Sequence, residues 1–216
     1  FNTLITDGVA AAQVQEDAIN AMNTQLALSG NYSREASQEM QDFASSLQQT
    51  TKFGDETILQ MTALASTFGK SNEETRKLVS AATELSAATG MSLEGSIKNL
   101  GKTYAGMTGE LGESLPIIRT LTAEQLKAGA ALDLITNRFG GSAASQVKTF
   151  SGLTQQLSNT FGDFTEVVGF GVTQNEAVLE VMSEVNKAIF GVTGELQNNT
   201  LAYKQLVGEG LVLMID

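Results

Sequence analysis

The fold is decided by residues 121–152, which read LTAEQLKAGAALDLITNRFGGSAASQVKTFSG. The apolar residues of this stretch return to one side of a helix, at Leu126, Ala130, Leu134 and Phe139. Thr122 followed three residues later by Gln125 is the pattern of a capping box, which begins a helix. Gly140 and Gly141 are typical of a helix end. The stretch therefore predicts a helix over 122–139 with a defined start and stop.

The same spacing recurs along the chain on both sides of this stretch. Apolar stripes at helical spacing occupy residues 36–47, 58–68, 78–88, 93–104 and 178–189. Ser71 with Glu74 predicts a second capping box, and Gly69 and Gly90 stand where helix C-caps belong. A single proline in 216 residues agrees with a helical chain, and 21 glycines indicate that its helices are repeatedly interrupted. The predicted class is all-α, with little or no sheet.

Composition predicts three regions. Residues 1–52 form N-terminal flanking helices, and residues 53–170 form a helical core region whose short amphipathic helices make a bundle over about 55–170. Residues 171–216 form C-terminal flanking helices. The core region is interrupted at 106–121, where glycines and one proline predict a loop with a short extended piece at 117–121. Phe1 and the apolar run at 211–215 predict a piece of a longer protein.

The residue types that carry most enzymatic chemistry are missing from the sequence. Without His or Cys the chain has no thiol nucleophile, no histidine base and no zinc site of the usual kind. Only an all-oxygen metal site is conceivable, and no calcium-loop motif supports one. The net charge of −11 disfavours sequence-specific nucleic acid binding. We therefore expect no catalytic, cofactor-binding or metal-binding residues, and no enzyme.

Two patterns that suggest chemistry have simpler structural explanations. Gly101-Lys102-Thr103 resembles the end of a phosphate-binding loop, but the glycine that the motif requires falls one residue off, at Gly95. A helix C-terminus with a basic residue in its last turn explains this pattern better than a phosphate-binding loop does. Paired carboxylates suggest a glycosidase, as at Glu73-Glu74, Asp55-Glu56 and Glu16-Asp17, yet acids are common in the first turn or on the polar face of a helix.

The longest apolar stripe begins in the quoted stretch and continues beyond it. Its spacing predicts one helical face of about six turns. This face either packs into the core or is shared with another copy of the chain. Its residues are Val147, Phe150, Leu153, Leu157, Phe161, Phe164 and Val168.

Three segments in this order resemble the central region of the tail tape measure proteins of long-tailed bacteriophages. They are GMSLEGSIKNLGK at 90–102, LTAEQLKAGAALDLITNRFGG at 121–141 and TFSGLTQQLSNTFGDF at 149–164. The similarity covers roughly residues 40–190. It implies a mainly helical, non-catalytic protein in the lumen of the tail tube near the tip, made in the host cytoplasm. Such a protein sets tail length during assembly and is released during DNA ejection.

The resemblance also implies partners. These are further copies of the chain in a parallel bundle, expected to be a trimer, the tail tube, distal tail and tip or hub proteins, and the tail assembly chaperones. Two other functions stay open. Glycine-rich amphipathic helices could insert into the host membrane during genome delivery, although the net charge of −11 disfavours anionic membrane surfaces. An unrelated helical adaptor would instead show sustained heptads, whereas these stripes are short.

Overall fold

The computed structural model describes residues 2–173, and this part contains helices and turns but no strand. The predicted all-α class is therefore confirmed. The helices are α1 (Asn2–Leu28), α2 (Arg34–Gln48), α3 (Asp55–Ser66), α4 (Asn72–Thr89), α5 (Leu93–Thr103), α6 (Gly109–Ser114), the 3₁₀ helix η1 (Pro116–Thr120), α7 (Ala123–Lys127), α8 (Ala130–Phe139), α9 (Ser142–Val147) and α10 (Phe150–Thr173). The helices predicted after residue 173 lie outside the described residues.

The chain divides into two compact units, Phe1–Ala12 with Thr165–Asp216, and Gln13–Phe164. In the first unit, α1 and α10 approach each other closely at Gly8 and Gly169. A Cβ atom on Gly169 would overlap the Gly8 carbonyl group, and one on Gly8 would lie 2.5 Å from the Thr165 carbonyl oxygen. Only glycine permits two helix backbones to come this near.

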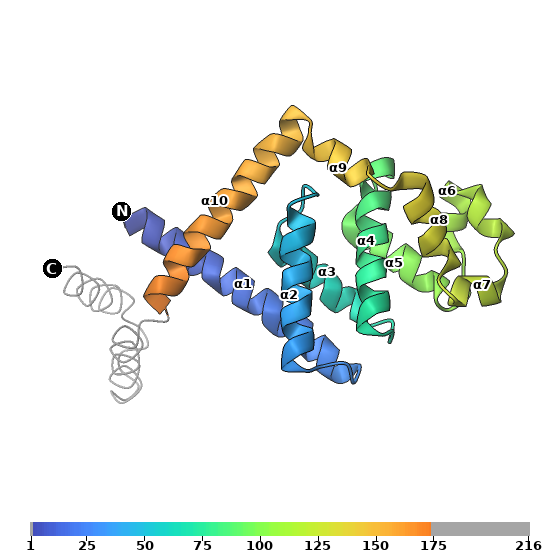
Figure 1. Ribbon diagram of the computed structural model, residues 1–216, viewed down its shortest axis with the longest axis horizontal. Helices are drawn as coiled ribbons and strands as arrows, with labels where there is room; N and C mark the ends of the chain where they lie inside the picture. Colours follow the sequence, from blue (N-terminus) through green and yellow to red (C-terminus); the bar gives the residue numbers. More distant parts are fainter. Residues whose placement is uncertain (1, 174–216) are drawn as a thin grey trace, which may run out of the picture. The chain divides into compact units, whose positions relative to one another are not determined.

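The second unit is built around α4, which packs against α2, α3, α5, α8 and α9 (Figure 1). The side of α4 that carries Leu78, Ala82 and Leu85 is fully buried. Its start is the predicted capping box, because the Ser71 hydroxyl accepts from the Glu74 amide and the Glu74 carboxylate accepts from the Ser71 amide. The second half of α1 and all of α2 belong to this unit, since Met22, Leu26, Met40 and Ala44 are completely buried.

The predicted loop at 106–121 is only partly a loop. It contains α6 and η1, and the extended piece expected at 117–121 is wrong because residues 117–120 lie in η1. Pro116 opens η1, where its fixed φ favours a helical turn and its missing amide hydrogen costs nothing. Leu111 and Ile118 are fully buried, and these apolar anchors hold the segment against the core.

The helix predicted over 122–139 is divided into α7 and α8. Its start is confirmed, because the Thr122 hydroxyl accepts from the Gln125 amide while the Gln125 side chain accepts from the Thr122 amide. The break comes at Gly129, whose φ of +89° lies outside the helical region. The predicted end is also confirmed, since Gly140 is the C-cap and Gly141 has a φ of +87°.

Candidate functional site

The predicted apolar face lies on the outside of α10. Phe150 is 88% exposed, Leu157 71% and Phe161 61%, and Leu153 and Phe164 are also more than half exposed. Within the described part of the chain, this face therefore does not pack into the core. The ring centroids of Phe161 and Phe164 lie 6.3 Å apart along the same face.

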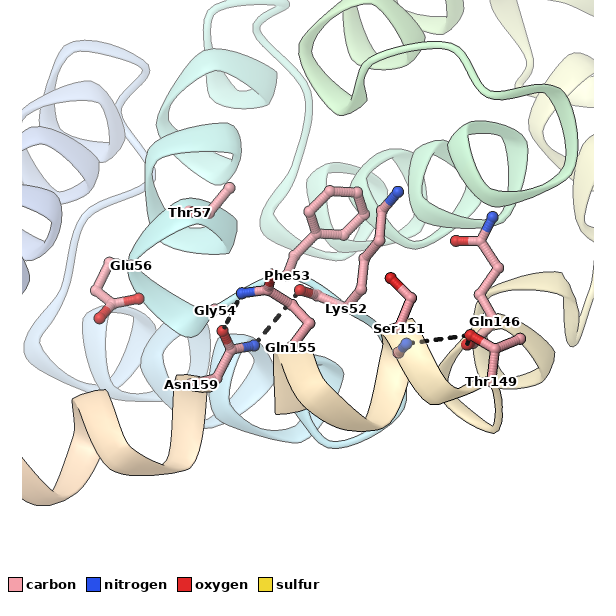
Figure 2. A pocket seen from close by; sticks show the side chains of 11 residues that line it. Lys52, Phe53, Gly54, Glu56, Thr57, Gln146, Thr149, Ser151, Gln155 and Asn159 are labelled. Atoms are coloured by element: carbon pink, nitrogen blue, oxygen red, sulfur yellow. Dashed lines mark hydrogen bonds between the residues drawn. The ribbon is translucent and has the colours of Figure 1, made fainter. Parts of the chain in front are cut away.

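The face is shorter than predicted at its N-terminal end. Val147 is the last residue of α9, and α10 begins only at Phe150. The Thr149 hydroxyl accepts a hydrogen bond from the Gly152 amide at 3.1 Å, which caps α10 and separates the two helices (Figure 2). The Thr149 cap can be recognised in the sequence only when the break between α9 and α10 is already known. The side chain of Val168 is outside the described residues.

The opposite side of α10 is polar and faces the protein. The Gln156 side-chain amide donates to the Gln48 carbonyl oxygen at 2.6 Å and to the Thr51 carbonyl oxygen. The Asn159 amide donates to the Lys52 carbonyl oxygen at 3.5 Å. Residues 150–164 thus reverse the usual order of an amphipathic surface helix, with polar side chains inward and large apolar side chains outward.

A polar cavity of about 720 Å³ lies between the start of α3 and the α9–α10 corner (Figure 2). One hydroxyl beside the cavity, that of Thr149, donates to the Gln146 carbonyl oxygen and so stabilises the turn between these two residues. The lining residues come from 52–57 and 146–159, and they are Lys52, Phe53, Gly54, Glu56, Thr57, Gln146, Thr149, Ser151, Gly152, Gln155 and Asn159.

Three carboxylates meet beside this cavity. Asp55, Glu56 and Asp163 each place an oxygen so that the three atoms lie within 4.8 Å of one another. Burial and the nearby charge of Asp55 raise the pKa of Asp163. Burial first, and then the charges of Asp55 and Asp163, raise the pKa of Glu56. Asp55 and Glu56 do lie in the first turn of α3 as predicted. No local pattern could have added Asp163, which is 108 residues from Asp55 along the chain.

The segment Gly101-Lys102-Thr103, which resembles part of a phosphate-binding loop, is the end of a helix, as the structural interpretation of its sequence predicted. α5 ends at Thr103 with Lys102 in its last turn. The buried Thr103 hydroxyl donates to the Leu100 carbonyl oxygen at 2.6 Å, which is a bond within the helix. Gly101 lies under the ring of Phe68, so its role is to allow close packing.

Comparison of the chain with protein-family models, curated proteins and solved structures gives no match. Among the described residues, none of the helices combines the length and apolar character needed to cross a bilayer.

Proposed function

We propose that this chain is a non-catalytic structural segment of a phage tail tape measure protein, and that α10 packs against the same helix of further copies. The observation that carries the proposal is the reversed polarity of residues 150–164. Their polar side is already hydrogen-bonded to the 48–52 segment, so the side left for a partner is the apolar one. Large exposed apolar surfaces of this kind mark protein–protein contacts.

The spacing of the face suits a bundle of parallel copies. Phe150 and Phe161 are eleven residues apart, and so are Leu153 and Phe164. Eleven residues make three turns of about 3.67 residues each, so the face winds only slightly around the helix. Burying one such side chain contributes about 1.5–3 kcal/mol. The five exposed side chains of this face therefore supply apolar surface that association of copies would bury.

A tail ruler needs length, which helices supply at about 1.5 Å per residue. It also needs surfaces that do not retain the DNA that later passes through the tube, and a net charge of −11 meets that requirement. The proposed location is the tube lumen near the tip, with contacts to tube, distal tail and tip or hub proteins, and to assembly chaperones before incorporation.

The proposed location is tested on intact particles. In purified tails the chain should resist added protease until DNA ejection is triggered, because the tube wall shields it. Recovery of the chain only from host cytosol, with none in purified virions, would contradict the proposal.

The proposed self-association is tested in solution by sedimentation-velocity measurements on the full chain. Leu157→Glu should shift the chain towards monomer, because it places a charge in the centre of the apolar face. Ser158→Glu adds the same charge at an exposed position about 100° around the helix. This control should associate as the wild type does. Equal behaviour of the two variants would show that the face is not the contact.

Insertion into the host membrane is the second candidate function, and the exposed apolar face of α10 favours it as well. In that case the face would bind lipid, and the wild-type chain would release dye from neutral vesicles while Leu157→Glu would not. Absence of both binding and leakage would remove this candidate.

A further inference from the structure

The carboxylates of Asp55, Glu56 and Asp163 form a concentrated negative charge on the second unit. Their oxygens lie within 4.8 Å of one another, a distance at which like charges repel strongly. The ion pairs of residues 2–173 involve other acids, namely Glu39, Glu73, Glu74 and Glu94. No lysine or arginine of the described chain therefore compensates the three carboxylates by direct pairing.

Two glutamines hold this group in place. Gln48, the last residue of α2, accepts from the Asp55 amide at 2.7 Å and donates to Asp163 Oδ2 at 2.7 Å. Gln15 of α1 donates from Nε2 to Asp55 Oδ2 at 3.0 Å. Residues of α1 and α2 therefore position the carboxylates of Asp55, in α3, and Asp163, in α10.

Gly54 makes room for the third carboxylate. A Cβ atom at residue 54 would lie 2.6 Å from Glu56 Oε2, so a larger residue would displace the Glu56 side chain. Figure 2 shows Glu56 and Gly54 next to each other where the 52–54 segment enters α3.

Two of the oxygens in this group lack a hydrogen-bond donor. Asp55 Oδ1 and Gln15 Oε1 are buried and have no partner, and each residue is only 8% exposed. Asp55 Oδ2 accepts from Gln15 Nε2, so Oδ1 is the oxygen of this carboxylate that remains without a donor. Buried acceptors of this kind call for a donor or a cation.

We propose that Asp55, Glu56 and Asp163 bind a divalent metal ion, and that Ca²⁺ is the ion that fits. Hard cations take carboxylate and amide oxygens, and Ca²⁺ places them at about 2.3–2.6 Å in flexible geometry. Three oxygens that lie within 4.8 Å of one another can all reach one Ca²⁺ at these distances. Mg²⁺ demands near-ideal octahedral geometry at about 2.0–2.1 Å and gives up its water reluctantly, so a site of three carboxylates suits it less.

The ion would connect α3 to α10, the helix that carries the exposed apolar face. This inference does not depend on the proposed function, because it follows from the oxygens alone. A failure to bind metal would leave the association of α10 untouched.

The test is titration of the full chain with CaCl₂, after removal of metal with EDTA, followed by calorimetry. We expect one saturable site with a Kd on the order of 0.1–1 mM, and weaker binding of Mg²⁺. Asp163→Asn should weaken Ca²⁺ binding by about tenfold or more, because it removes a charged ligand. Asp133→Asn changes an exposed aspartate of α8 in the same way and should bind as the wild type does.

Glu56→Gln is the second test variant and should also weaken Ca²⁺ binding by about tenfold or more, so that the test does not depend on the folding of one protein. The thermal unfolding temperature should rise more with CaCl₂ than with KCl of equal ionic strength, because KCl only screens the repulsion between the carboxylates. Two outcomes would overturn the proposal. One is the absence of saturable heat with either divalent ion. The other is equal Ca²⁺ affinity in the wild type, Asp163→Asn and Glu56→Gln.

Discussion

The ring of Phe68 lies directly against the backbone of Gly101. A Cβ atom at residue 101 would overlap Cζ, Cε2 and Cε1 of that ring. Because Phe68 packs against the buried core, this contact fixes the distance between the segment after α3 and the last turn of α5. The glycine that resembles part of a phosphate-binding motif is therefore a packing residue.

Gly101→Ala should destabilise the chain by about 1–3 kcal/mol, because the Phe68 ring must leave its site. In a Phe68→Leu background the same change should cost less or even stabilise, since alanine favours a helix over glycine by about 1 kcal/mol. Urea unfolding of the four proteins gives the coupling between the two positions. Additive effects would contradict the contact.

Gly129→Ala should also destabilise, by at least about 1 kcal/mol, because the φ of +89° is unfavourable for a residue with a side chain. Gly162→Ala is the matched change inside α10, where a Cβ atom would meet nothing within 4 Å. It should stabilise by up to about 1 kcal/mol. Thermal unfolding of both variants measures the difference. A loss of the same size in both would argue against the break at Gly129.

Stability should depend on pH through the carboxylate group. The pKa values of Glu56 and Asp163 are raised in the folded chain, so the folded state holds protons more tightly than the unfolded state does. In EDTA, the two carboxylates should therefore lower the free energy of unfolding at pH 7. This destabilisation should diminish as the pH falls towards the ordinary glutamate pKa of 4.5.

Urea unfolding between pH 7 and pH 5 can isolate this contribution by comparing the wild type with Asp163→Asn. The difference between the two proteins should shrink as the pH falls. A difference that stays constant would mean that Asp163 does not interact with its acidic neighbours.

Tyr104 should ionise only under strongly alkaline conditions. Burial, with smaller effects from Glu74 and Asp133, raises the pKa of Tyr104 to about 12. Its ring also lies 4.2 Å from the Lys70 ammonium group. Spectrophotometric titration of the wild type and Tyr104→Phe should differ by one phenolate that forms near pH 12. A difference that develops near pH 10 would place the Tyr104 hydroxyl in water.

Local rules predicted much of this fold. The capping boxes at Ser71 and Thr122 and the glycine at the end of α4 form as their patterns indicate, because each depends on residues within one turn. The break at Gly129 was not predicted, since an isolated glycine is tolerated in many helices and does not by itself indicate a positive φ.

The carboxylate group and the orientation of α10 could not be predicted from spacing. Asp163 meets Asp55 through tertiary packing, with Gln48 joining both. The periodicity placed Phe150, Leu157 and Phe161 on one face of a helix, but periodicity cannot tell an inward face from an outward one. That choice follows from the hydrogen bonds of Gln156 and Asn159 to the 48–52 segment.

The reversed polarity of α10 also has a consequence for the solubility of the chain. A newly made copy displays Phe150, Leu157 and Phe161 to water from the moment it folds. Its solubility then depends on how soon another protein shields these side chains.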